Sequence, residues 1–226
     1  GVIGTFLGPR SPGTAYVLLH HSFGELDGAY RTWGYVRGGT GALAHAIADA
    51  ARHLGAEVRV NAGVRSILVR DGRAIGVELE TGEKLFARVV ASSADPKRTF
   101  LTLLEPSSLP QDFVRAIRNF NIEGSSGKVN LALSRRPDFA VLPGSGPHLT
   151  GDVTIGPSMD YIEKAYEDAK YGDFSHRPYI DMCMPSALDP TMAPPGKHIM
   201  SMFIQYAPYH LKNGTWPDRR EEFGDT

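Results

Sequence analysis

Three glycines placed directly before a helical pattern constrain the fold of this chain most. Residues 30–36 alternate aromatic with small or polar side chains, which predicts a strand. Gly38, Gly39 and Gly41 then interrupt that strand, because glycine accepts backbone angles and close approaches that other residues do not. Apolar residues at helical spacing follow the glycines, and they predict an amphipathic helix over residues 40–54.

Gly55 stands where a helix C-cap glycine belongs, and residues 57–60 resume as a short strand, so the order is that of a βαβ unit. The letters from Gly39 to Ala44 fit the pattern GxGxxG/A, typical of a turn that holds a dinucleotide pyrophosphate at a helix N-terminus. Such a site also needs an acidic residue at the end of the next strand, and Glu57 comes too early for that role. Two interpretations stay open: a pyrophosphate site, and a tight turn that lets the helix pack on a sheet.

The next segment carries the pattern of three strands joined by tight turns. Asp71-Gly72 is a strong two-residue hairpin signal between expected strands 64–69 and 74–79. Thr81-Gly82 turns the chain again, and residues 85–91 should form a third strand. Its near-continuous apolar run is typical of a strand that is buried on both faces.

The remainder of the chain predicts a sheet covered by helices. Strands are expected over residues 126–134, 178–185 and 198–206, and helices over residues 111–119 and 159–171. Methionines at four positions of the last two strands and their ends fit a packed core, or alternatively the wall of a site for an apolar substrate. Cys183 has no cysteine partner and is interpreted as core. His148, Lys128 and Tyr35 are polar candidates, but their spacing forms no triad or carboxylate pair, so no catalytic residue is assigned.

The composition narrows the class of protein. A hydrophobic content of 42% and a charged content of 22% are ordinary for a soluble globular protein. The formal net charge of -1 gives no electrostatic case for binding nucleic acid. A single cysteine fits a reducing compartment, so a cytoplasmic location, or a mitochondrial one in a eukaryote, is expected. No apolar run is long enough for a membrane span, which leaves a peripheral membrane contact open, and no group of residues suggests a metal site. The oligomeric state is not predicted.

The order of short motifs along the chain resembles one family. The phrases "WGYVRGGTGAL", "GAEV", "DGRAIGVELETGE" and "VVASSADP" occur in sequence, followed by "KVNLAL", "PSALDPTMAPPGKH" and "QYAPYHL". This order and spacing is similar to the phytoene-desaturase-like FAD-dependent oxidoreductases, in particular their pyridine nucleotide-disulphide oxidoreductase domain subgroup. The resemblance covers nearly the whole chain, but it matches the middle portion of that family. The family's N-terminal GxGxxG loop and its C-terminal flavin motif have no counterpart here.

The resemblance implies a mixed α/β fold in which residues 37–100 are part of a Rossmann-like FAD-binding domain. Residues 1–36 and 101–226 would belong to a substrate domain with a mixed sheet, ending before that domain is complete. The family places the backbone of Val64 at the adenine end of FAD. It brings Trp33, Tyr35, Gly38 and Gly39 near the isoalloxazine and the substrate cavity. Val64 can equally be an ordinary valine at the edge of a strand.

The resemblance implies hydride transfer between FAD and an apolar small molecule, with the FAD site incomplete in this segment. The segment alone is therefore expected to be inactive. Two other interpretations compete. One is a non-catalytic binding or interaction module that retains the substrate domain. The other is an NAD-dependent Rossmann enzyme that uses residues 39–44.

Overall fold

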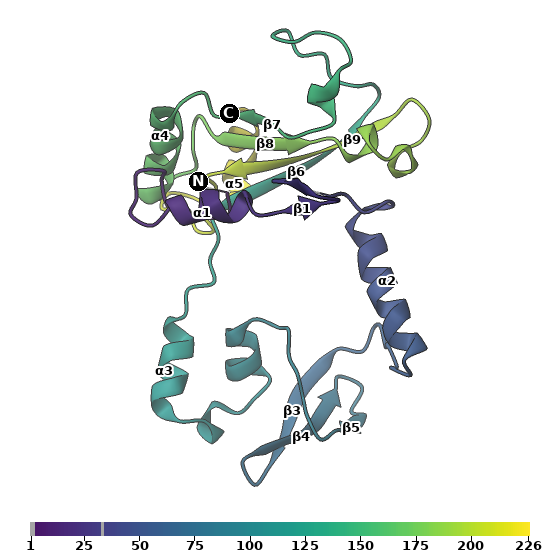
Figure 1. Cartoon of the computed structure of the whole chain (residues 1–226). Coiled ribbons are helices and arrows are strands. Elements are labelled where there is room, and N and C mark those ends of the chain that lie inside the picture. The colour runs from purple at the N-terminus through teal and green to yellow at the C-terminus, as the bar shows by residue number, and fades with distance from the viewer. Residues whose placement is uncertain (1–2, 33) are drawn as a thin grey trace. The chain divides into compact units, whose positions relative to one another are not determined.

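The computed structural model describes residues 3–32 and 34–226 (Figure 1), and the chain divides into two compact units. The sheet unit comprises Gly1–Asp49 and Glu123–Thr226, and the meander unit comprises Ala50–Ile122. The longer helices are α1 (Ala15–His21), α2 (Gly39–His53), α3 (Gln111–Asn119), α4 (Met159–Lys170) and α5 (Trp216–Gly224). The strands are β1 (Glu25–Leu26), β2 (Ala29–Tyr30), β3 (Val64–Arg70), β4 (Arg73–Leu79), β5 (Lys84–Phe86), β6 (Ser126–Leu133), β7 (Val153–Ile155), β8 (Tyr179–Cys183) and β9 (His198–Gln205). The expected mixed α/β architecture is confirmed.

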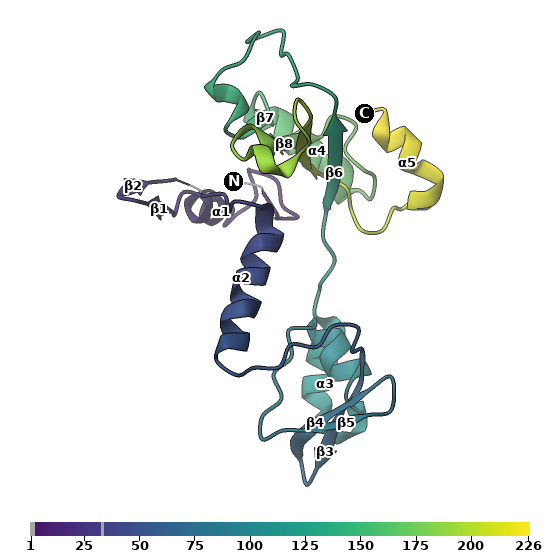
Figure 2. The same cartoon turned by 90° about the vertical axis from the view of Figure 1, so that its right-hand side faces the viewer.

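The meander unit is built on the three-stranded antiparallel sheet β3-β4-β5, which can be followed in Figure 2. Asp71 and Gly72 have φ values of 51° and 72°, so they form the tight hairpin turn that their sequence predicts. The predicted strands 64–69 and 74–79 and the predicted helix 111–119 are confirmed. Helix α3 buries Val114 and Ile117, one turn apart, which is the packing expected of a short amphipathic helix.

Helix α2 begins at Gly39 and ends at His53, in agreement with its predicted span. Gly55 has a φ of 88° and donates to the carbonyl of Arg52 at 2.9 Å. The next amide, that of Ala56, donates to the carbonyl of Ala51 at 3.0 Å. These two bonds form a Schellman motif, so Gly55 is the C-cap glycine that the sequence indicates.

Three strand predictions are wrong. In the segment 30–36 only Tyr30 is in a strand, because the backbone leaves the extended region at Arg31, where φ is 62°. Residues 57–60 form no strand, and residues 85–91 contribute only the short β5. Val89, expected to be buried on both faces, is 79% exposed. A strand needs a neighbour to pair its backbone groups, and the described pairings give neither segment a second neighbour. The expected βαβ unit is therefore not formed among the described residues.

The sheet unit contains the four-stranded sheet β6-β9-β8-β7, in which each pairing is antiparallel. Its core lies under α4, where Ala165 and Ala169 pack against Tyr179 and Tyr206. The Ser158 side chain caps α4 by accepting the Tyr161 amide at 3.1 Å. The predicted strands in this unit and the predicted helix 159–171 are confirmed. Among the described residues, no helix combines the length and the apolar character needed to cross a bilayer.

Candidate functional site

The glycine turn at the start of α2 is shaped by two consecutive residues with positive φ. Gly38 has a φ of 84° and Gly39 a φ of 81°, values that side-chain-bearing residues adopt only at a cost. A β-carbon at Gly39 would lie 3.0 Å from the Met192 methyl carbon. A β-carbon at Gly38 would lie 3.1 Å from that of Ala42. The turn therefore requires glycine at both positions for backbone reasons and for space.

The carboxylate of Asp189 occupies the N-terminal end of α2. Its Oδ2 atom accepts a hydrogen bond of 2.6 Å from the Gly38 amide, and its Oδ1 atom accepts from the hydroxyl and amide of Thr191 at 2.6 and 3.0 Å. The hydrogen bond from the Thr191 hydroxyl and the one from the Gly38 amide lower the pKa of Asp189. The Gly39 amide is also engaged, because it donates to the carbonyl of Val36 at 2.9 Å.

These bonds bear on the two interpretations of the glycine turn. A helix N-terminus attracts an anion through its free amides. Here a carboxylate of the chain itself already holds the Gly38 amide, and the Gly39 amide has a backbone partner. The geometry favours the tight-turn interpretation over a pyrophosphate site at this helix. It also removes support from the NAD-dependent alternative that uses residues 39–44.

The strand register gives the four-stranded sheet one polar face. Lys128, Phe203, Asp181 and Thr154 stand opposite one another across β6, β9, β8 and β7. In the neighbouring row the hydroxyl of Ser201 donates to the side-chain oxygen of Asn130 at 3.0 Å. We call this surface the polar face; its members are Lys128, Asn130, Thr154, Asp181, Cys183 and Ser201. Residues at the alternate positions are mainly apolar, including the buried Met182 and Met200, which fits the core interpretation of these two methionines.

Tyr35 lies against this polar face. Its hydroxyl donates to the carboxylate of Asp152 at 3.5 Å, just before β7. Burial, and then the negative charge of Asp152, raise the pKa of Tyr35 to about 12. Burial and the same carboxylate raise the pKa of Asp181, and burial followed by the charges of Asp152 and Asp181 raises the pKa of Cys183. Tyr35, Asp152, Asp181 and Cys183 therefore form one electrostatically coupled group, which we call the Tyr35 cluster.

The remaining predicted residues lie elsewhere. Val64 begins β3, pairs with Leu79, and lines a small cavity of about 220 Å³ in the meander unit together with Val90 and Arg98. Trp33 lies outside the described residues. The structure thus brings Tyr35, Gly38 and Gly39 into the sheet unit, and places Val64 in the other unit.

Sequence reasoning did not single out Asp152, Asp181 or Asp189. Asp181 carries a signal, because it is the one acidic residue inside the apolar strand segment PYIDMCMP. Asp152 and Asp189 lie in loops and offer no comparable pattern. Of the earlier candidates, Lys128 belongs to the polar face, whereas His148 packs its ring edge-on against Phe139. Within residues 3–32 and 34–226, no group of three metal-binding side chains is found.

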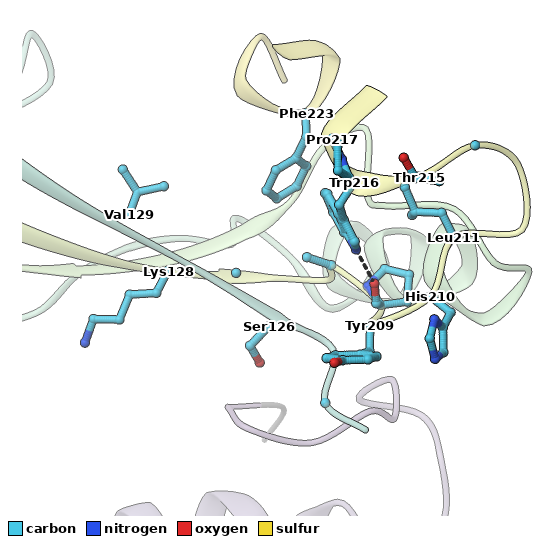
Figure 3. A pocket seen from close by; sticks show the side chains of 15 residues that line it. Ser126, Lys128, Val129, Tyr209, His210, Leu211, Thr215, Trp216, Pro217 and Phe223 are labelled. Atoms are coloured by element: carbon cyan, nitrogen blue, oxygen red, sulfur yellow. Dashed lines mark hydrogen bonds between the residues drawn. The ribbon is translucent and has the colours of Figure 1, made fainter. Parts of the chain in front are cut away.

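A larger cavity of about 730 Å³ lies along β6 and the segment that leads into α5 (Figure 3). Its walls include the aromatic rings of Tyr209, Trp216 and Phe223. The indole of Trp216 is fixed by a hydrogen bond of 3.0 Å to the carbonyl of Pro208. In Figure 3 the side chain of Lys128 points away from these rings, so this part of the wall is apolar.

Comparison with known proteins places this geometry in a class. The family described as flavin containing amine oxidoreductase matches residues 4–213, and the chain belongs to it. The chain is 41% identical to the mouse (Mus musculus) pyridine nucleotide-disulfide oxidoreductase domain-containing protein 2, over 97% of its own length and 39% of that protein. It is 32% identical to prolycopene isomerase 2 of an Oncidium hybrid cultivar, covering 83% of this chain and 28% of that protein. The predicted resemblance to the phytoene-desaturase-like oxidoreductases is thereby confirmed.

A solved structure agrees with the fold. An oxidoreductase from Methanosarcina mazei superposes with a TM-score of 0.56 at 17% identity, covering 84% of this chain and 36% of that one. The chain therefore spans well under half the length of these relatives. Membership of the family implies a flavin cofactor and a small-molecule substrate.

Proposed function

We propose that this chain is the central part of an FAD-dependent oxidoreductase that moves a hydride between the flavin and an apolar small molecule. The observation that carries the proposal is the side-chain-free turn at Gly38 and Gly39, with Tyr35 three residues before it. Three residues span at most about 11 Å, so a ligand that approaches the turn also comes within reach of Tyr35. In this proposal Gly38, Gly39, Tyr35 and Trp33 face the isoalloxazine and substrate, and Val64 faces the adenine.

The residues present suit such a cofactor in part. The turn has no side chain that would block the approach of a flat ring, and the cavity beside Val64 offers an apolar wall with one cation, Arg98. When bound, the flavin would supply the hydride acceptor or donor. The chain itself supplies the hydroxyl of Tyr35, which stays protonated near neutral pH because its pKa is about 12.

An apolar substrate is supported by two observations. The aromatic cavity at Tyr209, Trp216 and Phe223 offers a wall of the kind that binds hydrocarbon surface. Relatives of the chain carry names that print prolycopene isomerase, phytoene desaturase (lycopene-forming) and limonene dehydrogenase. We extend the shared chemistry, a hydrocarbon of the isoprenoid type, to this chain as a proposal.

The segment on its own is proposed to be inactive. Dinucleotide-binding domains hold the pyrophosphate in a parallel βαβ unit, and the described strands of this chain pair antiparallel. We retain the division into residues 37–100 as part of the cofactor domain and the remainder as substrate domain. A cytoplasmic or mitochondrial location also remains a proposal. The competing function, a binding module without flavin chemistry, is favoured by the already engaged amides of the glycine turn.

The decisive experiment is an FAD titration of the 226-residue chain and of the longer protein that would contain it, followed by flavin fluorescence. We expect weak or undetectable binding by the chain and stoichiometric binding by the longer protein. Gly39→Leu should weaken binding by the longer protein at least tenfold. Gly196→Ala is the matched control, because Gly196 also has positive φ but lies in open space. Binding of an apolar ligand without any FAD binding by the longer protein would favour the binding module.

A further inference from the structure

We infer that Asp181 accepts the proton that leaves the substrate during oxidation, and that Asp152 and Tyr35 position it. This inference rests on the proposed function and assigns a role to the Tyr35 cluster. Asp181 projects from β8 onto the polar face, where Thr154 donates to its Oδ1 atom at 3.3 Å. Tyr35 reaches the same place from the segment just before the glycine turn, and its hydroxyl donates to Asp152 at 3.5 Å.

The chemistry requires such a group. Desaturation breaks two C–H bonds on neighbouring carbons. One hydrogen leaves with its electron pair, as hydride, to an oxidised flavin. The electron pair of the second C–H bond becomes the new double bond, and that hydrogen leaves as a proton. A base of the protein must take this proton, and in the reverse reaction the same group returns it.

Asp181 suits this task better than its neighbours. It is half-buried, and burial together with Asp152 raises its pKa, which makes its carboxylate a stronger base than an exposed one. Tyr35 stays protonated near neutral pH, so it can donate a hydrogen bond but not take a proton. Asp152 is exposed and accepts the Tyr35 hydroxyl, which fits a positioning residue.

Every titratable group that faces Asp181 has been considered. Asp152 and Tyr179 surround it from the sheet, Cys183 follows it on β8, and Tyr35 covers it. His21 of α1 acts in the opposite direction, since its charge lowers the pKa of Asp181. Lys128 acts likewise on Cys183. The protonation of Asp181 therefore reflects a balance that single substitutions can shift in either direction.

The chain contains its own reporter of this balance, because Cys183 is its one cysteine. The rate of its alkylation by iodoacetamide at pH 8 measures the fraction of thiolate. Asp181→Asn and Asp152→Asn each remove a negative charge that raises the pKa of this thiol. Each should speed alkylation roughly threefold to tenfold, as expected for the loss of one nearby charge. Tyr35→Phe should slow it, because the hydrogen bond from Tyr35 lowers the pKa of the thiol.

The matched control is Asp225→Asn, an exposed aspartate beyond the end of α5, which should leave the alkylation rate unchanged. In the longer FAD-loaded protein, Asp181→Asn should slow anaerobic flavin reduction by substrate at least 100-fold with FAD binding retained. Circular dichroism checks the fold of each variant. If Asp181→Asn disturbs it, Asp152→Asn carries the alkylation test, because Asp152 is exposed.

Two results overturn the inference: alkylation rates in Asp181→Asn and Asp152→Asn equal to those of Asp225→Asn, or flavin reduction by Asp181→Asn within twofold of wild type. A third result has a different meaning. If the longer protein binds no FAD, the proposed function fails and the proton-acceptor role fails with it. The alkylation rates would still respond to the three substitutions, so the two failures can be told apart.

Discussion

The Gly38 amide and the Asp189 carboxylate are joined by a hydrogen bond of 2.6 Å, although 151 residues separate them in sequence. The bond ties the start of α2 to the proline-rich loop that follows β8. The same carboxylate accepts the hydroxyl and amide of Thr191. The glycine turn is thus held from outside, and its conformation depends on the charge of one aspartate.

Loss of that charge should loosen the turn. The pKa of Asp189 is lower in the folded state than in the unfolded state, so its stabilising contribution is present above the unfolded pKa of about 3.9. The contribution is lost as the pH falls through the lower, folded-state pKa. Asp189→Asn should therefore lower the melting temperature at pH 7 and change it little at a pH below the folded-state pKa. Melting curves at the two pH values, with Asp225→Asn as control, check this; an equal loss at both would contradict a charge-based role.

Replacing Gly39 should destabilise the fold through the backbone and through Met192. Gly39→Ala forces a side chain into φ of 81°, which costs about 1–2 kcal/mol, and adds a 3.0 Å contact to the Met192 methyl. Urea unfolding gives the total loss. Gly196→Ala reports the backbone part alone, because no atom lies within 4 Å of its added carbon. The double variant Gly39→Ala with Met192→Ala should recover the steric part, and no recovery would show that the contact relaxes freely.

Asp152→Asn should lower the pKa of the Tyr35 hydroxyl. Burial is the larger cause of the raised value and the Asp152 carboxylate the second, so the pKa should fall below about 12 but stay above the ordinary 10. Ultraviolet titration of tyrosinate, read as the difference between each protein and its Tyr35→Phe counterpart, isolates this residue among nine tyrosines. A value that stays at 12 would mean that Asp152 does not act on Tyr35.

Tyr206 should be among the most sensitive positions of the sheet unit. Its side chain is completely buried, and its hydroxyl donates to the carbonyl of Leu7 at 2.8 Å. Tyr206→Ala should cost about 3–5 kcal/mol, as for other large core aromatics. Tyr206→Phe should cost about 1–2 kcal/mol, since one buried carbonyl loses its partner. Chemical unfolding measures both; Tyr209→Ala, at a residue 65% exposed, is the control and should change little.

Local signals predicted much of the fold. The Asp71-Gly72 turn, the Gly55 cap and the spacing of apolar residues in α2 each depend on a few neighbouring residues, and the structure confirms them. The strands expected over residues 57–60 and 85–91 failed because a strand needs partners from distant parts of a chain. Periodicity shows which residues suit a strand, but it does not show whether a partner is present.

The candidate site follows the same division. Tyr35, Gly38 and Gly39 were indicated by a motif, but the groups that touch them come from residues 152, 181, 183 and 189. The register of β7, β8 and β9 brings these residues together, and no single-sequence pattern encodes that register. An isolated aspartate within an apolar strand, such as Asp181, was the one visible sign.

The order of segments along the chain also bears on synthesis. Residues 50–122 form a contiguous unit, whereas the sheet unit is assembled from a segment before them and a segment after them. During translation the meander unit has all its residues once residue 122 has been added. Residues 3–32 and 34–49 must then wait for β6, β8 and β9, which are made last. The exposed apolar residues of α1, among them Leu18 and Leu19, are therefore open to chaperones for as long as the ribosome needs to finish the sheet.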